Sequence, residues 1–167
     1  MKNSKETKKP SENNLKKLKS FLDEEFKPKP KDIKPPMMTY DEMQNFHKQK
    51  ILPVYKKLKQ QLSQYNFDSV DYSIHTRVAI LKIADTLSLF HLKVDINNAS
   101  RQITIYYSLK YRHKKKKKLF EIRDLENKTI PFNDINTIND DLILSLFTKW
   151  YTGKNETIQK DKERNVE

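Results

Sequence analysis

Five consecutive lysines, residues 114–118, follow Arg112 and His113 in the stretch YRHKKKKKLF. Lysine ammonium groups neutralise phosphates without reading bases, so contact with a polyanion is one interpretation of this run. A solvated hairpin tip that prevents edge-to-edge pairing of sheets is a second interpretation, and contact with a membrane surface or an acidic protein is a third. Because adjacent like charges repel one another, folding alone does not require five lysines here.

Alternation of apolar and polar residues over 101–112 predicts a strand whose polar side extends this positive charge. We expect odd-numbered residues from 103 to 109 to face the core and even-numbered ones to face solvent. Single-stranded nucleic acids bind to such surfaces, with phosphates along a positive track and bases stacked on aromatic rings. The predicted nucleic-acid-binding residues are His91, Lys93, Tyr106, Lys110, Arg112, Lys114, Lys115, Lys116, Lys117, Lys118 and Arg123.

A weaker pattern concerns carboxylates. Metal-dependent nucleases often place an Asp on one strand and an acidic residue, a spacer and Lys on the next. Asp95 and the triplet Glu121-Ile122-Arg123 approach this pattern, with Arg in place of Lys. Alternating charge on strand faces also produces such triplets by chance, so a nuclease is the third functional interpretation, after a nucleic-acid binder and an adaptor.

Other residues exclude several kinds of chemistry. The sequence has no cysteine, and its four histidines lack metal-ligand spacing, so we predict no metal site and no cofactor. Gly153 is the one glycine, whereas phosphate-binding loops and nucleophile elbows need glycine where the backbone takes unusual conformations. We therefore expect a protein without enzymatic activity.

The overall composition is strongly basic. The 167 residues contain 34 Lys and Arg against 22 Asp and Glu, for a net charge of +12, which attracts polyanions. Abundant Asn and Ile offer a second explanation, a genome rich in A and T that favours Lys codons. Without cysteine, a secretory leader or an apolar run long enough for a membrane helix, the chain is expected to be intracellular, in the cytoplasm.

The N-terminal part is predicted to stand apart from the domain. We expect a disordered basic tail at 1–14, a short amphipathic helix at 15–26 and a stiff Lys/Pro linker at 27–38. A protein-interaction adaptor that docks this helix on a partner is the alternative function. Acidic residues 23–25 beside the apolar face argue against an anionic membrane. The predicted partner-docking residues are Leu15, Leu18, Phe21, Leu22 and Phe26.

Residues 39–153 are predicted to form an α+β domain. A capping box at Thr39 and Glu42 begins a long helix over about 40–65, which Pro53 kinks or divides. A four-stranded antiparallel meander follows over 70–123, with the lysine run at its last hairpin. Asn139 caps a final helix, and both helices pack on one face of the sheet. Residues 154–167 are expected to be a disordered tail.

A four-stranded meander followed by a helix resembles in outline the Whirly and Pur-type proteins that bind single strands, although no motif of those families occurs in the sequence. A shared outline has little weight for function. The sequence itself favours a non-enzymatic nucleic-acid-binding module, with single strands preferred, and an acidic protein as the other candidate partner.

Overall fold

A computed structural model of the chain describes residues 10–26 and 34–165. The chain divides into two compact units, Met1–Lys34 and Pro35–Glu167, and each unit is described by itself below. Most of the expected linker and the first nine residues of the expected tail lie outside the described residues.

The described residues of the first unit form the helix α1 (Pro10–Glu25). The predicted helix at 15–26 is therefore too short at its start, and residues 10–14 are helical rather than part of a disordered tail. Proline suits the first helical position, because its missing N–H would have no helical partner there.

The second unit begins with a helical arm that the sequence predicts well. The first helix, α2 (Tyr40–Phe46), starts at the expected capping box. The Thr39 hydroxyl accepts a hydrogen bond from the Glu42 N–H at 3.2 Å, and the Glu42 carboxylate accepts one from the Thr39 N–H at 2.7 Å. The helix N-terminus thus has its first orphan donors satisfied.

Pro53 divides this arm, as expected. A π-helical turn (His47–Ile51) joins α2 to the next helix, α3 (Leu52–Leu62). Proline lacks the N–H for the regular helical bond and crowds the preceding turn, which a wider turn accommodates. The arm ends at Leu62, before the predicted end near residue 65, and Tyr65 is exposed.

The sheet is antiparallel, as predicted, but it has six strands instead of four. Its strands are β1 (Ser69–Ile74), β2 (Val78–Ala84), β3 (Ser88–Asn97), β4 (Gln102–Arg112), β5 (Leu119–Glu121) and β6 (Asn127–Pro131). They lie in the order β1-β2-β3-β4-β5, and β6 also pairs with β4. Alternation over 70–80 is compatible with one long strand or two short ones, and the structure has two, β1 and β2, separated by residues 75–77. β6 escapes prediction because Ile130 is its one buried side chain.

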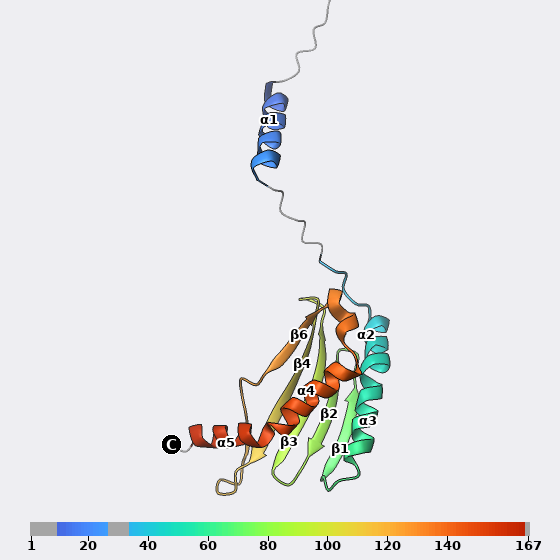
Figure 1. The fold of residues 1–167 in the computed structure, drawn as a ribbon, viewed down its shortest axis with the longest axis vertical. Coiled ribbons are helices and arrows are strands. Elements are labelled where there is room, and N and C mark those ends of the chain that lie inside the picture. The colour runs from blue at the N-terminus through green and yellow to red at the C-terminus, as the bar shows by residue number, and fades with distance from the viewer. Residues whose placement is uncertain (1–9, 27–33, 166–167) are drawn as a thin grey trace, which may run out of the picture. The chain divides into compact units, whose positions relative to one another are not determined.

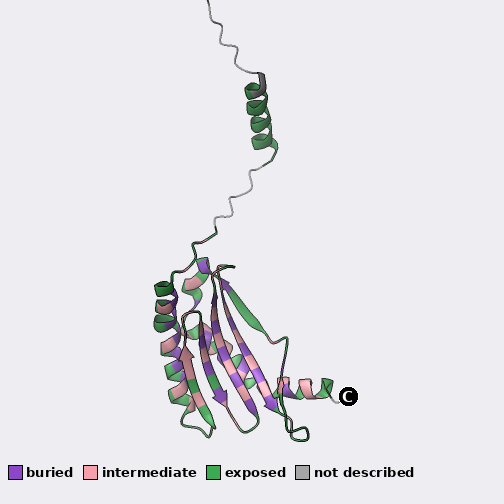
Figure 2. Cartoon of the chain, turned by 180° about the vertical axis from the view of Figure 1, so that it is seen from behind, coloured by how far each residue is buried: buried purple, intermediate pink, exposed green. Residues whose placement is uncertain are grey.

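The two faces of the sheet differ sharply. Helices α3 and α4 (Asp140–Thr152) cover one face (Figure 1). Strand β4 alternates along its length between buried and partly exposed residues, which confirms the predicted orientation. Tyr55 of α3 anchors the helical layer, since its hydroxyl donates a hydrogen bond to the Leu92 carbonyl at 3.1 Å. Burial also raises the pKa of this hydroxyl. Seen from behind, the opposite face is covered by none of the helices described in the second unit (Figure 2); we call it the open face.

The C-terminal region departs from expectation. Asn139 caps α4 as predicted, with its side-chain oxygen 2.9 Å from the Leu142 N–H. The expected disordered tail at 154–167 is wrong, because α5 (Lys154–Arg164) follows directly and buries Ile158. Gly153 has a right-handed φ of −83°, so the chain resumes a helix at once instead of turning away.

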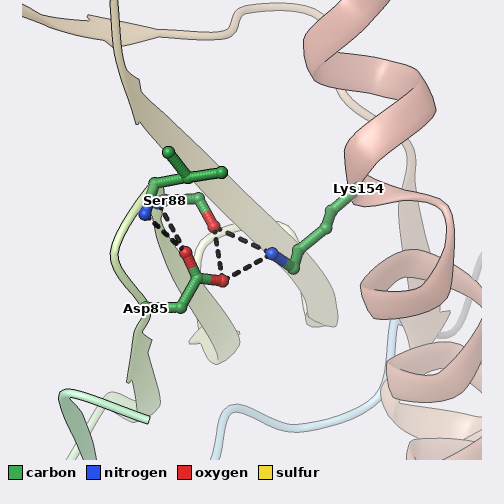
Figure 3. A network of polar contacts seen from close by, with 4 residues as sticks. Asp85, Ser88 and Lys154 are labelled. Carbon is green, nitrogen blue, oxygen red and sulfur yellow. Dashed lines mark hydrogen bonds and ion pairs between the residues drawn. The ribbon is translucent and has the colours of Figure 1, made fainter. Parts of the chain in front are cut away.

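A polar network fastens the start of α5 to the sheet (Figure 3). The Lys154 ammonium lies 2.6 Å from the Asp85 carboxylate and 3.0 Å from the Ser88 hydroxyl, at the turn between β2 and β3. Burial raises the pKa of Asp85, but hydrogen bonds from Lys154 and from two backbone N–H groups outweigh this effect and leave the pKa below its usual value. Because Lys154 and its partners lie some seventy residues apart, sequence patterns do not reveal the pairing.

Candidate nucleic-acid interface

The open face carries several of the predicted site residues in neighbouring register positions. His91 lies opposite Ser108, Lys93 opposite Tyr106, and Leu89 opposite Lys110. Facing pairs on adjacent strands have Cβ atoms only about 5 Å apart. The prediction that these polar residues point away from the core agrees with their partial exposure.

A break in the sheet edge creates a hollow on this face. β6 pairs with β4 only up to Tyr106, and β5 pairs only from Lys110 onward. Residues 107–109 therefore pair with β3 on one edge of β4 but with neither β5 nor β6 on the other. A left-handed residue, Asp124 with φ 57°, lies in the short connection from β5 to β6. The hollow has a volume of about 550 Å³ and is lined by Lys93, Thr104, Tyr106, Tyr107, Ser108, Glu121, Ile122, Arg123, Asp124, Leu125 and Asn127.

Three predicted site residues meet at this hollow, namely Lys93, Tyr106 and Arg123. The Lys93 ammonium lies 5.6 Å from the centroid of the Tyr106 ring, a cation–π arrangement. Partial burial and the nearby charge of Asp95 raise the pKa of Tyr106, so its phenol is neutral at physiological pH. Among the described residues, no ion pair involves Lys93 or Arg123. Both cations are therefore available to a ligand.

His91 reports a cluster of positive charge beside the hollow. Partial burial lowers its pKa, and the charges of Lys93, Lys82 and Lys110 lower it further. At neutral pH the imidazole is therefore uncharged, although three lysines contribute positive charge around it. Sequence reasoning missed Lys82, although it lies between the buried Leu81 and Ile83 of β2, and that alternation was available as a signal.

The lysine hairpin, residues 113–118, joins β4 and β5 as predicted. The His113 N–H donates to the Lys118 carbonyl at 3.1 Å, and the Lys117 N–H donates to the His113 carbonyl at 3.0 Å. All five lysines are exposed. None of the ion pairs in the described part of the chain uses them. Lys117 adopts a left-handed φ of 49°. Glycine and asparagine take up this conformation readily, whereas it is unfavourable for lysine.

The open face carries charges of both signs, and the excess of positive over negative charge increases toward the lysine hairpin. Lys110 and Arg112 of β4 lead into the five lysines, and Tyr106 lies six residues from Arg112, about 20 Å along the strand. Acidic groups interrupt the face, because Glu121 lies opposite Lys110 and Asp95 lies two residues from Lys93. The predicted residues thus form a strip with the hollow near one end and the hairpin at the other.

The carboxylates of the nuclease pattern are not brought together. Asp95 lies on β3 opposite Thr104, and Glu121 lies on β5 opposite Lys110. Their register positions on β4 are six residues apart, which corresponds to about 20 Å. In the described part of the chain, no cluster of three or more His, Asp or Glu side chains is arranged to hold a metal ion.

Helix α1 presents a second candidate surface. All five predicted docking residues are exposed, with 43–66% of the surface of each residue accessible; they are Leu15, Leu18, Phe21, Leu22 and Phe26. The Phe21 and Phe26 rings contact each other edge to face at 6.5 Å between centroids. An apolar row of this kind, which the described residues of its own unit leave uncovered, has the spacing that helix-in-groove partners recognise.

The described helices include none with both the length and the apolar character needed to cross a membrane. No protein-family model, curated protein or solved structure matches the chain. The likeness in outline to Whirly and Pur-type proteins therefore has no support from these comparisons, and functional inference rests on the geometry of the chain itself.

Proposed function

We propose that this protein binds single-stranded nucleic acid, without catalysing a reaction, through the open face and the lysine hairpin. One observation carries the proposal: Lys93, Tyr106 and Arg123, from three separate segments, line one hollow on the open face, which the described helices of the second unit leave uncovered. An aromatic ring between two cations that have no ion-pair partner among the described residues matches the way single strands are held.

The two ends of the strip have different tasks in this proposal. At the hollow, a base stacks on the Tyr106 ring, and such stacking contributes about 1–3 kcal/mol for one base. At the hairpin, the lysines attract phosphates at long range and release counterions on binding. Neutral His91 adds a hydrogen bond without adding charge. Binding of this type tolerates many sequences, because phosphates and ring faces are common to all nucleotides.

The backbone of the hairpin supports a role for its charge. A left-handed position in a tight turn favours Gly or Asn, yet Lys occupies it. Local rules of this kind are commonly broken at functional sites, where another requirement outweighs turn preference. A purely structural hairpin tip has no such requirement. The five lysines are therefore better explained by an anionic ligand than by folding.

A salt-titrated binding assay tests the proposal. Labelled single- and double-stranded DNA and RNA are titrated with the protein between about 50 and 200 mM salt, a range over which binding to phosphates weakens steeply. Replacing residues 114–118 with Gln is expected to weaken binding to all sequences alike. The log–log salt slope becomes shallower by about 0.7 for each phosphate of a single strand that the variant no longer neutralises. Unchanged affinity and slope would return the hairpin to a structural role.

The exposed apolar row of α1 favours a second candidate function, an adaptor that docks this helix on an acidic partner protein. The lysines on α1, among them Lys16 and Lys19, suit an acidic rim around an apolar groove. Deleting residues 1–34 is expected to leave the second unit folded, since that unit is compact by itself. Partner capture is then abolished, whereas nucleic-acid affinity falls only with the deleted charge. A drop of several degrees in Tm would show that α1 belongs to the core.

A further inference from the structure

The hollow contains acidic as well as basic side chains, which a bare phosphate site would not. Glu121 and Asp124 line it together with Lys93 and Arg123. Carboxylates repel phosphate oxygens but accept hydrogen bonds from amino groups strongly, because a charged acceptor makes the bond roughly twice as strong as a neutral pair. Under the proposed function, this mixed lining suits the base of a nucleotide better than a phosphate, and Lys93 and Arg123 suit the flanking phosphates.

The rest of the lining suits a flat ring. Ile122 and Leu125 are apolar, Ile122 is buried, and Tyr106 supplies an aromatic surface. Asn127, the first residue of β6, lies opposite Tyr106 and brings an amide to the same place. Ligand sites generally combine an apolar lining with a few convergent polar groups and have volumes of about 300–1,000 Å³. The volume of about 550 Å³ falls within this range and accommodates one nucleotide.

We infer that the hollow selects amino-bearing nucleobases (cytosine, adenine and guanine alike) over thymine and uracil, with Glu121 or Asp124 accepting the exocyclic amino hydrogen. The exocyclic amino group is a donor in the three favoured bases, whereas thymine and uracil present a carbonyl acceptor at the corresponding position. A carboxylate facing that carbonyl is left unpaired and repelled. This inference rests on the proposed function and adds base selectivity to a surface that otherwise reads none.

Comparing cytosine with thymine or uracil isolates the amino group, since all three are pyrimidines of similar stacking area. We expect short oligo-C to bind the full chain about tenfold more tightly than oligo-T or oligo-U of the same length, as DNA and as RNA, at neutral pH and fixed salt. No binding of any oligonucleotide would refute the proposed function itself. Equal binding of all of them would refute the base selectivity and leave the proposed function standing.

Removal of the carboxylates provides the decisive variant. The double substitution Glu121→Gln/Asp124→Asn keeps size, and Asn tolerates the left-handed φ at position 124. We expect affinity for every oligonucleotide to rise as negative charge is removed, while the preference for C over T falls toward one. The control is Asp95→Asn, which removes a charge from the same face outside the hollow. This control should raise affinity and keep the preference.

A filled hollow gives an independent check that does not alter charge. Ser108→Trp places an indole in the hollow, on a strand position that tolerates aromatic residues. Ser73→Trp, on the same face but on β1, is its control. We expect Ser108→Trp to lower the affinity for oligo-C about tenfold, to the level of oligo-T. Ser73→Trp should change neither the affinity for oligo-C nor its preference over oligo-T. Near-native Tm values for both variants establish that they fold. A C preference that persists in Ser108→Trp would overturn the inference.

Discussion

Tyr106 and Tyr107 are neighbours on β4, yet the sheet gives them opposite tasks. Tyr107 is 8% exposed and stacks between Phe90 and Trp150, with ring centroids 5.3 and 4.9 Å away. Tyr106 lies on the open face, where Lys93 lies over its ring. The same residue type thus serves packing on one face and is available to a ligand on the other. Position relative to the pleat, rather than residue type, decides which tyrosine is a candidate for binding.

The largest expected effect lies on the covered face. Tyr107→Ala removes a ring from an aromatic stack, and a truncation of this size in a core typically costs about 3–5 kcal/mol of the free energy of unfolding. Tyr106→Ala is the matched control, and it should cost less than about 1 kcal/mol because its ring is only partly buried. Urea unfolding of both variants measures the difference. Equal decreases would mean that the open face is part of the core.

The same pair separates binding from stability in the opposite sense. Tyr106→Ala is expected to weaken single-strand binding by about 1–3 kcal/mol, because a stacked base loses its platform, with little change in salt slope. Tyr106→Phe keeps the ring and should retain most of the affinity. The measurement is fluorescence anisotropy at fixed salt. Full affinity in Tyr106→Ala would assign the ligand to the hairpin alone.

The contrast between the faces also explains what the sequence could predict. Alternation along β4 depends on local chemistry, so the orientation of residues such as Tyr106 and Lys110 was accessible from the sequence. The helix starts capped by Thr39 and Asn139 were accessible for the same reason. Features that depend on distant partners were not. α5 is held by the Lys154–Asp85 pair, and β6 is defined by its ladder with β4.

The hollow belongs to this second class. Arg123 was predicted as a site residue from charge and position, but nothing local places it beside Lys93. That proximity arises because β5 and β6 share one edge of β4 and leave a gap between them. Glu121 was considered only as part of a nuclease pattern with Asp95. The tertiary arrangement separates Glu121 from Asp95 and groups it with Asp124 instead.

A pH-dependent effect tests the covered side of the molecule. His47 is buried in the π-helical turn and neither ring nitrogen has a hydrogen-bond partner among the described residues. Burial lowers its pKa, and the Arg77 backbone and Asp95 oppose this only in part. The unfolded chain binds a proton near pH 6.5, which the folded chain does not. Stability is therefore complete above that pH and falls below it.

The expected slope is at most about 1.4 kcal/mol per pH unit for one histidine. Urea unfolding at pH 7.5 and 5.5 measures this slope. His91, whose pKa is also lowered, adds in the same direction, so the test compares wild type with His47→Phe and His91→Phe. His47→Phe should remove the larger part of the slope. A slope that survives in His47→Phe would assign the effect to other groups.

The smallest expected effect concerns the lysine hairpin, where local structure and residue type conflict. Lys117 has φ 49°, a conformation that costs an L-residue about 1–2 kcal/mol and costs glycine nothing. Replacing Lys117 with glycine removes this cost, but part of the stabilisation is offset because glycine makes the unfolded chain more flexible. Lys117→Gly is therefore expected to stabilise the domain by about 0.5–1 kcal/mol.

Lys115→Gly is the matched control for Lys117→Gly. It removes the same charge from the same run at a residue without positive φ, so it should stabilise nothing. Nucleic-acid affinity should fall by the same small factor in both variants, since each removes one ammonium group that attracts the phosphates of the bound nucleic acid. Thermal unfolding and salt-titrated binding of the pair measure the two effects separately. If Lys117→Gly gains stability and loses affinity while Lys115→Gly only loses affinity, the lysine at position 117 is kept for its charge against the preference of the turn. If neither variant loses affinity, the positive charge of the hairpin has a role other than binding nucleic acid.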